Sequence, residues 1–355
     1  MWTCGGGFET LTSFVPQPAG WAGAVIQRTV GGLTWPTLPG MSDPLANLKI
    51  IPAPQVRDRI DMAGAIRALR AVLADGFDPE TDQHRAVAHY RNGQLLMMPA
   101  DFGRYAGQKL ATVAPDNPGR GLDRIQAVYV LFDAITLTPV ALIDGTEITS
   151  LRTPALAAAM LEVVAVPEAS TMVIFGTGPQ GIRHVEAVSA VRPIQRVRFV
   201  GRDRQRAEAA VAAVAAPGLD VAVGSVEDAR GADIVVCATS AREPILDDAL
   251  IQPHTAVAAI GSHEAQVREL PAALMGRSQV IVESDRVART EAGDVVMAVA
   301  EGHLAFEDVV PMSALIRGAV EVDWSRPRVV KTCGMGWQDL AIAQAVMGKA
   351  DQAAS

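Results

Sequence analysis

The chain has 355 residues, of which 49% are hydrophobic, so it is long enough for two globular domains, each with its own core. Its formal net charge is -8, which excludes an overall positive field and argues against nucleic acid and acidic membrane surfaces as partners. No apolar run approaches the ~20 residues that a membrane-spanning helix needs. The three cysteines, Cys4, Cys237 and Cys333, are isolated and lack the spacing of metal ligands, so we expect a cytoplasmic protein without a metal site.

Residues 1–40 differ in composition from the rest of the chain. They are rich in Gly, Pro, Thr and Trp, and their first cationic side chain is Arg28, so they do not form a signal peptide. The sequence Met41-Ser42-Asp43-Pro44 resembles a natural start. We expect residues 1–40 to be disordered or a wrongly extended reading frame, with a docked arm as the alternative. Neither carries chemistry.

The first folded region combines one helix with several short strands. Asp61 can cap a helix whose apolar positions recur at helical spacing and which ends before Gly76. The dipeptide Asn92-Gly93 lies between alternating segments and predicts a hairpin. Because the turns are short, we expect an antiparallel or mixed sheet. The expected strands are 48–51, 85–90, 94–98, 108–113, 125–132 and 139–143.

A region of a different type begins at Leu151-Arg152-Thr153-Pro154. Thr153 can cap a helix over 155–164 that has Pro154 at its first position. Strands then alternate with helical segments, which predicts a doubly wound parallel sheet of the Rossmann type. These strands are expected at 171–175, 196–200, 233–238, 255–260 and 279–282. Near the C-terminal end, 326–332 reads as a strand, 333–336 as a turn and 338–347 as an amphipathic helix.

The segment 171–181 carries a dinucleotide-binding pattern. An apolar strand runs directly into Gly176-Thr177-Gly178-Pro179-Gln180-Gly181, which is Gly-x-Gly-x-x-Gly. Gly176 allows the tight turn, Gly178 lets backbone approach a pyrophosphate, and Gly181 lets the helix pack on the sheet. A glycine triplet alone is weak, since turns and helix caps also use glycine. The alternating strands and helices around it favour a dinucleotide at the helix N-terminus.

The end of the next strand bears on the choice between NAD(H) and NADP(H). Enzymes that prefer NAD usually place an acidic side chain there to hold the ribose 2'-hydroxyl. This chain has Gly201 and Arg202 at that place, with Arg204 close behind. Arg202 favours a 2'-phosphate, so we expect NADP(H) to be preferred over NAD(H). Asp203 keeps NAD open, and it can equally be the N-cap of the next helix.

Many ordered segments between about residues 48 and 348 resemble the ornithine cyclodeaminase and mu-crystallin family. The resemblance implies a Rossmann-type domain, 153–322, inserted in a discontinuous α+β domain, 41–152 plus 323–350, for substrate binding and dimerisation. It also implies a nicotinamide cofactor, a small carboxylate-bearing amino or imino acid as substrate, and a homodimer. The matching segments are 96–100, 107–110, 114–118, 131–133, 142–146, 149–153, 176–180, 231–235, 268–270, 331–334 and 338–340.

The resemblance also assigns site residues. Arg85, Lys109 and Arg152 match the cations that surround the substrate carboxylate in the family. Two guanidinium forks can grip a carboxylate, and a lysine beside two arginines should have a depressed pKa suited to proton transfer. Taken singly, each would read as a surface cation. The expected cofactor-binding residues are Gly176, Gly178, Pro179, Gln180, Gly181, Arg202, Asn117 and Thr239. After Asn117 the chain departs from the family, with Asp123-Arg124 where many relatives have Pro-Thr.

One position departs from the cyclodeaminating branch of the family. There the branch carries an aspartate that handles the substrate amine during ammonia loss and ring closure, whereas this chain has His263. The loop follows a parallel strand, where ligands bind in such sheets. His263 can therefore contact substrate or nicotinamide, and a loop histidine without a role is the equal alternative. A register shift would let Glu264 supply the missing carboxylate.

We therefore expect an NAD(P)H-dependent oxidoreductase that acts on the Cα–N bond of a small amino or imino acid, as a ketimine reductase or an amino-acid dehydrogenase. One alternative is ornithine cyclodeaminase, which forms proline and ammonia. Another is a mu-crystallin-like protein that binds a small ligand with NADPH and does not turn it over. The intact trio of Arg85, Lys109 and Arg152 favours catalysis.

Overall fold

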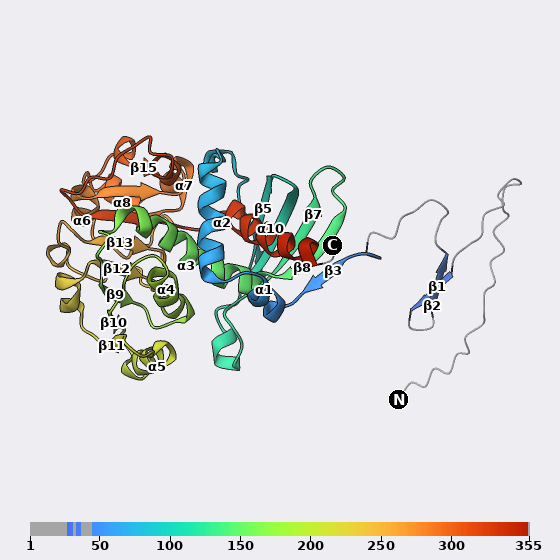
Figure 1. Ribbon diagram of the computed structural model, residues 1–355, viewed down its shortest axis with the longest axis horizontal. Helices are drawn as coiled ribbons and strands as arrows, with labels where there is room; N and C mark the ends of the chain where they lie inside the picture. The colour runs from blue at the N-terminus through green and yellow to red at the C-terminus, as the bar shows by residue number, and fades with distance from the viewer. Residues whose placement is uncertain (1–26, 31–32, 37–44, 354–355) are drawn as a thin grey trace, which may run out of the picture. The chain divides into compact units, whose positions relative to one another are not determined.

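The structure, a computed structural model, describes residues 27–30, 33–36 and 45–353 (Figure 1). The chain divides into two compact units, residues 1–46 and 47–355. In the first unit, β1 (Gln27–Val30) pairs antiparallel with β2 (Leu33–Pro36). The expectation that residues 1–40 are disordered or a wrongly extended reading frame stays a prediction. The rest of residues 1–40 lies outside the described residues.

In residues 47–355, the first layer is a six-stranded mixed sheet in the order β3-β8-β7-β6-β5-β4. Only β3 and β8 pair in parallel, and the other neighbours are antiparallel. The predicted hairpin at Asn92-Gly93 joins β4 to β5, so the prediction of a mixed sheet is confirmed. The strands are β3 (Lys49–Ile51), β4 (Ala86–Tyr90), β5 (Gly93–Phe102), β6 (Tyr105–Val113), β7 (Ile125–Asp133) and β8 (Pro139–Asp144).

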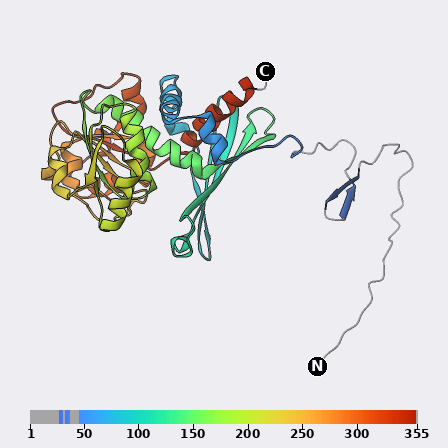
Figure 2. The same cartoon turned by 60° about the horizontal axis from the view of Figure 1, so that its bottom comes forward.

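Helices cover one face of this sheet. Both α3 (Gly145–Val164) and α10 (Gly336–Ala353) pack on its strands, and α2 (Met62–Ala74) packs on both helices. Figure 2 shows these helices along one side of the sheet, next to α1 (Ala53–Arg59). Asp61 caps α2 as predicted, accepting a hydrogen bond from Gly64 N at 2.7 Å. Side chains alternate along β7: Tyr129 and Leu131 are fully buried, whereas Val128 is 38% exposed.

The start of α3 differs from the prediction. The helix begins at Gly145, and its N-cap is Asp144, which accepts a hydrogen bond from Glu147 N at 2.8 Å. Thr153 is therefore not a cap, and Pro154 lies inside the helix. The pair Thr-Pro resembles a helix start, but Asp144 supplies an earlier cap, and burial of the following apolar turns stabilises the helix despite the hydrogen bond lost at Pro154.

The second sheet has eight parallel strands in the order β11-β10-β9-β12-β13-β16-β14-β15. The chain runs outward from β9 to β11 and then returns to the other side of β9, so the strand order reverses between β9 and β12. This confirms the predicted doubly wound fold. The strands are β9 (Thr171–Phe175), β10 (Arg196–Val200), β11 (Asp220–Val223), β12 (Ile234–Cys237), β13 (Ala256–Ala259), β14 (Gln279–Val282), β15 (Val310–Pro311) and β16 (Arg328–Lys331).

Helices lie on both sides of the parallel sheet (Figure 1). Alternate residues of β9 join different apolar clusters: Met172 and Ile174 belong to one, Val173 and Phe175 to the other. Both faces of the strand are therefore buried, as its unbroken apolar run predicts. The remaining α-helices with described bounds are α4 (Pro179–Ser189), α5 (Arg204–Val214), α6 (Ala272–Arg277), α7 (Asp285–Thr290), α8 (Gly293–Ala300) and α9 (Met312–Ile316).

The C-terminal segment contributes to both sheets. Residues 323–350 were assigned to the first domain, but β16 lies in the parallel sheet, between β13 and β14. The chain then crosses through residues 332–335 to α10, which packs on β5 and β6. The assignment of β16 is thus corrected. All four of its residues are buried, and its backbone groups form hydrogen bonds with β13 on one edge and β14 on the other. Among the described residues, none of the helices combines the length and the apolar character needed to cross a membrane.

Candidate active site

The predicted dinucleotide turn lies at the carboxyl end of β9. Gly176 has φ +118°, and a Cβ there would lie 2.3 Å from Ala238 O, while one at Gly181 would lie 2.2 Å from Gly176 O. Both positions therefore require glycine. Gly178 is the N-cap of α4 and provides no side chain to satisfy the first helical N–H groups. The uncapped N-terminus of an 11-residue helix, with one obligatory glycine before it and another in its first turn, fits a dinucleotide pyrophosphate.

The first turns of α4 contain a buried histidine. His184 Nδ1 lies 2.7 Å from Gln180 O, and the side chain is fully buried. Burial, opposed by this hydrogen bond, lowers the pKa of His184 to about 4. A neutral histidine that donates to its own helix holds the turn in shape.

The end of β10 presents a cation and a capped helix. Arg202 is exposed, and within the described residues it makes no ion pair. Asp203 is the N-cap of α5 and accepts a hydrogen bond from Arg206 N at 3.2 Å. Arg204 pairs with Glu208 along the helix at 2.9 Å. Asp203 therefore has the structural role that the sequence left open, and Arg202 remains directed to solvent at this strand end.

The core of the site is an ion-paired cluster formed by three elements. Lys109 Nζ on β6 lies 2.7 Å from Asp339 Oδ2 on α10, and Arg152 Nε on α3 lies 3.5 Å from Asp339 Oδ1. All three side chains are at least nine-tenths buried. Lys109 Nζ also lies within hydrogen-bonding distance, 3.3 Å, of Thr149 Oγ1. Two cations share one buried carboxylate, so the cluster carries a net positive charge suited to an anion.

The pKa of Lys109 is lowered to about 8. Burial is the largest cause, Asp339 opposes it, and the nearby charges of Arg152 and Arg85 lower the pKa further. The predicted direction is confirmed, although loss of hydration outweighs the two arginines that the prediction invoked. A lysine with such a pKa is mostly charged at pH 7 and can still release its proton.

Arg152 is held by a chain of polar contacts from the parallel sheet. Its Nη1 donates to Gln338 Oε1 at 3.0 Å, and Gln338 Nε2 donates to Glu283 Oε1 at 2.6 Å. Glu283 follows β14 and also accepts from Cys333 N at 2.7 Å and Gly334 N at 3.1 Å. The guanidinium orientation is therefore linked to both sheets.

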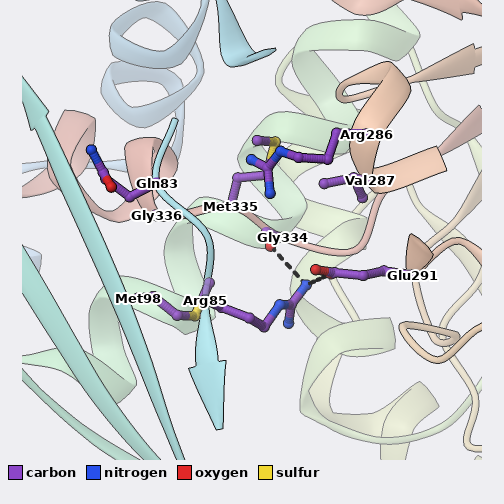
Figure 3. A pocket seen from close by; sticks show the side chains of 9 residues that line it. All are labelled: Gln83, Arg85, Met98, Arg286, Val287, Glu291, Gly334, Met335 and Gly336. Carbon is purple, nitrogen blue, oxygen red and sulfur yellow. Dashed lines mark hydrogen bonds and ion pairs between the residues drawn. The ribbon is translucent and has the colours of Figure 1, made fainter. Parts of the chain in front are cut away.

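Arg85 lies in an adjoining pocket (Figure 3), whose lining comes mainly from β5, from α7 and from the segment between β16 and α10. Its Nη2 forms an ion pair with Glu291 and donates to Gly334 O at 3.2 Å. Among the described residues Arg85 forms its hydrogen bonds through Nη2, so Nε and Nη1 can bind a ligand. The lining residues are Gln83, Arg85, Met98, Arg286, Val287, Glu291, Gly334, Met335 and Gly336.

The predicted trio thus forms two adjacent groups rather than one ring of cations. Lys109 and Arg152 meet at Asp339, whereas Arg85 points into the pocket. Gly334 lies between them, because it bonds to Arg85 and a Cβ on it would lie 2.6 Å from Arg152 Nη1. Met98 lines the pocket and is the cross-strand neighbour of Lys109.

The remaining predicted residues lie at the edges of this region. His263 follows β13 with its side chain exposed, and loss of hydration, then the charge of Arg85, lowers its pKa. Glu264 is also exposed. Asn117 Nδ2 donates to Asp123 O at 3.0 Å, so it holds its own loop, and no contact joins it to the glycine turn within the described part of the chain. Thr239 follows β12, beside the glycine turn.

Three carboxylates of the site, Asp339, Glu283 and Glu291, were not predicted. An aspartate near the start of an expected helix, as Asp339 is, can equally be a helix cap. For Glu283 a signal exists, because it directly follows the predicted strand 279–282 at the edge where ligands bind. For Glu291 we find none.

Known proteins resemble this chain over most of its length. Residues 55–354 match the sequence profile of the Ornithine cyclodeaminase/mu-crystallin family. A Delta(1)-pyrroline-2-carboxylate reductase of Bacillus cereus is 32% identical over 272 residues, which cover 74% of this chain and 83% of that protein.

Two solved structures share the fold. The Delta(1)-pyrroline-2-carboxylate reductase of Thermococcus litoralis, in complex with NADH and L-proline, has a TM-score of 0.81 at 22% identity, covering 86% of this chain and 98% of that chain. An archaeal alanine dehydrogenase dimer with bound NAD has a TM-score of 0.80 at 24% identity, covering 87% and 97%. The matched profile extends from α1 into α10 and includes the ion-paired cluster and the dinucleotide turn. The chain belongs to the ornithine cyclodeaminase/mu-crystallin family.

Proposed function

We propose that this protein is a nicotinamide-dependent imine reductase, which reduces the C=N bond next to the carboxylate of a small imino acid or runs the reverse oxidation. The observation that carries the proposal is the buried cluster of Lys109, Arg152 and Asp339, a proton donor beside a carboxylate-binding cation. The 32% identical relative is named for the reduction of pyrroline-2-carboxylate, which is such an imino acid.

Substrate binding follows from the charges of the two adjacent groups. Arg85 has donors on Nε and Nη1 to offer a carboxylate, and Arg152 adds positive charge behind Gly334. Charge-assisted bonds of this kind orient a planar carboxylate. The carbon next to that carboxylate would then face the edge of the parallel sheet, and the nitrogen would face the Lys109 side.

Reduction of a C=N bond adds a hydride to carbon and a proton to nitrogen. The nicotinamide cofactor supplies the hydride when it is bound. Lys109 supplies the proton, because its pKa of about 8 leaves it charged near neutral pH but able to release the proton. Asp339 stabilises the ammonium form of Lys109 before the transfer. After the transfer, the neutral amine of Lys109 regains a proton from water. In the oxidative direction Lys109 accepts the proton.

The finer cofactor preference is part of the proposal. Arg202 is exposed at the end of β10, and Asp203 is engaged as the cap of α5. Within the described parts of the chain, the exposed guanidinium of Arg202 has no neighbouring carboxylate free to hold a 2'-hydroxyl, which supports NADP(H) over NAD(H). The two solved structures named above contain NADH and NAD, so the preference would distinguish this chain from them.

A homodimer is also proposed, through the face of the six-stranded sheet opposite the helices. On that face the register aligns Met97, Leu110 and Val128 across β5, β6 and β7, and Val130, Leu142 and Ile50 across β7, β8 and β3. Ile50 is 72% exposed and Val128 is 38% exposed. A contiguous apolar sheet face open to solvent supports a partner surface, and the archaeal alanine dehydrogenase is a dimer.

The test is turnover with external cofactor. NADPH and NADH are each incubated with cyclic ketimines that carry a carboxylate beside the C=N bond, and the nicotinamide absorbance is followed. We expect oxidation of the cofactor that depends on the ketimine, and at least a hundredfold slower rate for Lys109→Ala, since general acid catalysis contributes about that much.

Two results would contradict the proposal. One is ammonia release from ornithine with catalytic cofactor and no ketimine reduction, which would indicate a cyclodeaminase in spite of His263. The other is tight ligand binding without cofactor oxidation across the whole panel, which would indicate a binding protein.

A further inference from the structure

Two loops at the carboxyl edge of the parallel sheet are tied to one buried carboxylate. Glu269 Oε1 accepts hydrogen bonds from Thr239 N and Thr239 Oγ1, both at 2.7 Å, and Glu269 Oε2 accepts from Gly261 N at 2.7 Å. Thr239 lies in the loop after β12, and Gly261 lies in the loop after β13. A single side chain with no exposed surface therefore sets the separation of these loops.

Two further buried charges hold Glu269 and the second loop. Asp294 Oδ1 accepts from Glu269 N at 2.7 Å, and Asp294 Oδ2 lies 3.1 Å from Lys331 Nζ. Lys331 Nζ in turn donates to Ser262 O at 2.5 Å. The three charged side chains come from a loop, from α8 and from β16, and each is at most 1% exposed. Burying three charges is costly unless they are fully paired, and the chemistry of Lys109 and Arg152 uses none of them.

The position of these loops indicates what they hold. The strand order reverses between β9 and β12, and ligands of doubly wound sheets bind across that crevice. The glycine turn after β9 and Arg202 after β10 lie on the side of the adenine half. The loops after β12 and β13 lie on the other side, and Ala238 O packs against Gly176 at the boundary. His263 stands in the second of these loops.

We propose that the buried network of Glu269, Asp294 and Lys331 positions the nicotinamide half of the cofactor by fixing the loops after β12 and β13. The three are positioning residues, because they act through Thr239 and the backbone of Gly261 and Ser262. The adenine half, held by the glycine turn and Arg202, does not depend on them. The inference rests on the cofactor of the proposed function, but its test requires no turnover.

The test compares the whole cofactor with its adenine half. Glu269→Gln keeps the size of the side chain, but its amide NH2 group would face a backbone N–H in place of an acceptor. We expect the Kd of NADPH and NADH to rise about tenfold or more, and the Kd of ADP and of adenosine 2',5'-bisphosphate to stay unchanged. Both are measured by calorimetry without substrate. Glu307→Gln is the matched control, because Glu307 is paired with Arg289 of α7 at the surface and lies outside both loops.

A second pair of variants addresses the first loop alone. Thr239→Val removes the Oγ1 bond to Glu269, whereas Thr239→Ser keeps the hydroxyl. Only the valine variant should therefore raise the Kd of the whole cofactor while leaving the Kd of the adenine fragments unchanged. This pair decides the matter if Glu269→Gln fails to fold. Equal weakening of the cofactor and the adenine fragments would overturn the proposal, because the network would then support the whole domain. Unchanged cofactor binding would overturn it as well.

Discussion

At the scale of single residues, the chemistry depends on how one lysine is charged. Two sets of effects on the pKa of Lys109 oppose each other. Burial and the two arginines favour the neutral amine, whereas Asp339 favours the ammonium. A proton donor needs a pKa near the working pH. The balance within this cluster, rather than any one contact, is what suits Lys109 to its proposed role.

The first prediction concerns the pH profile of reduction. Lys109 donates only while charged, so kcat/KM for ketimine reduction should fall as pH rises through about 8. Asp339 raises the pKa of Lys109, so Asp339→Asn should lower that pKa and move the fall to lower pH. The profile is measured for both proteins, with Glu301→Gln as the control. A profile that stays in place, or that moves to higher pH in Asp339→Asn, would argue that Lys109 is not the proton donor.

The second prediction concerns Arg202. If its guanidinium binds a 2'-phosphate, Arg202→Ala should weaken NADPH binding by about 1.5 to 3 kcal/mol and leave NADH almost unchanged. Arg204→Ala is the matched control, because Arg204 is also exposed but forms an ion pair with Glu208. Titration of both cofactors into each variant provides the measurement. Equal losses for NADPH and NADH would show that Arg202 has a structural role.

The partners of these residues mark the limit of sequence reasoning at this scale. Arg85, Lys109 and Arg152 could be named because they match a family pattern. That Lys109 and Arg152 share Asp339 could not, since an aspartate near the start of a helix is a common cap and its contact with β6 is made only by tertiary packing. The pairing of Arg85 with Glu291 depends likewise on how α7 meets the pocket.

At the scale of elements, α10 carries Asp339 and begins at a second buried carboxylate. Asp82 Oδ2 accepts a hydrogen bond from Trp337 N at 3.1 Å, and Asp82 is only 7% exposed. Burial raises the pKa of Asp82 to about 7, against the lowering effects of the Trp337 and Gln83 N–H groups and of Arg286, while Asp339 raises it further. Above neutral pH, Asp82 is therefore ionised in the folded protein, and its buried charge lowers the free energy of unfolding.

The third prediction follows from the sign of this shift. A carboxyl whose folded pKa lies above its unfolded value destabilises the fold progressively as pH rises from 3.8 to about 7. Asp82→Asn keeps an acceptor for Trp337 N without the charge, so its Tm should exceed that of the unsubstituted protein by at least about 2 °C at pH 8. The difference should shrink as pH falls towards 4. A variant that is less stable at every pH would show that the ionised cap stabilises α10.

Elements also show why some of the fold followed from sequence and some did not. The strand β9, the hairpin at Asn92-Gly93 and the cap of α2 rest on local signals, and all are confirmed. The start of α3 was placed wrongly because the Thr153-Pro154 signal is local, whereas the helix is stabilised by packing between two sheets. The strand β16 was expected, but its membership in the parallel sheet depends on pairing with strands far away in sequence.

At the scale of the whole molecule, the fourth prediction tests the proposed dimer. Val128→Glu places a charge on the open apolar face of the six-stranded sheet and should convert a dimer into monomers. Val226→Glu is the control, because Val226 is also 38% exposed but lies in the region of the parallel sheet. Sedimentation velocity distinguishes the species. Val128→Glu sedimenting as a dimer would show that this face is not the interface.

The central claim is that the protein transfers a hydride to the carbon between the carboxylate and the nitrogen. The most direct measurement uses NADPH and NADH deuterated at nicotinamide C4 with a cyclic ketimine, and locates the label in the product by NMR. We expect one deuterium at Cα when the transferring face of the cofactor carries the label, and product formation at least about a hundredfold slower with Lys109→Ala under the same conditions. An amino acid product without deuterium at Cα from either labelled face would contradict the account.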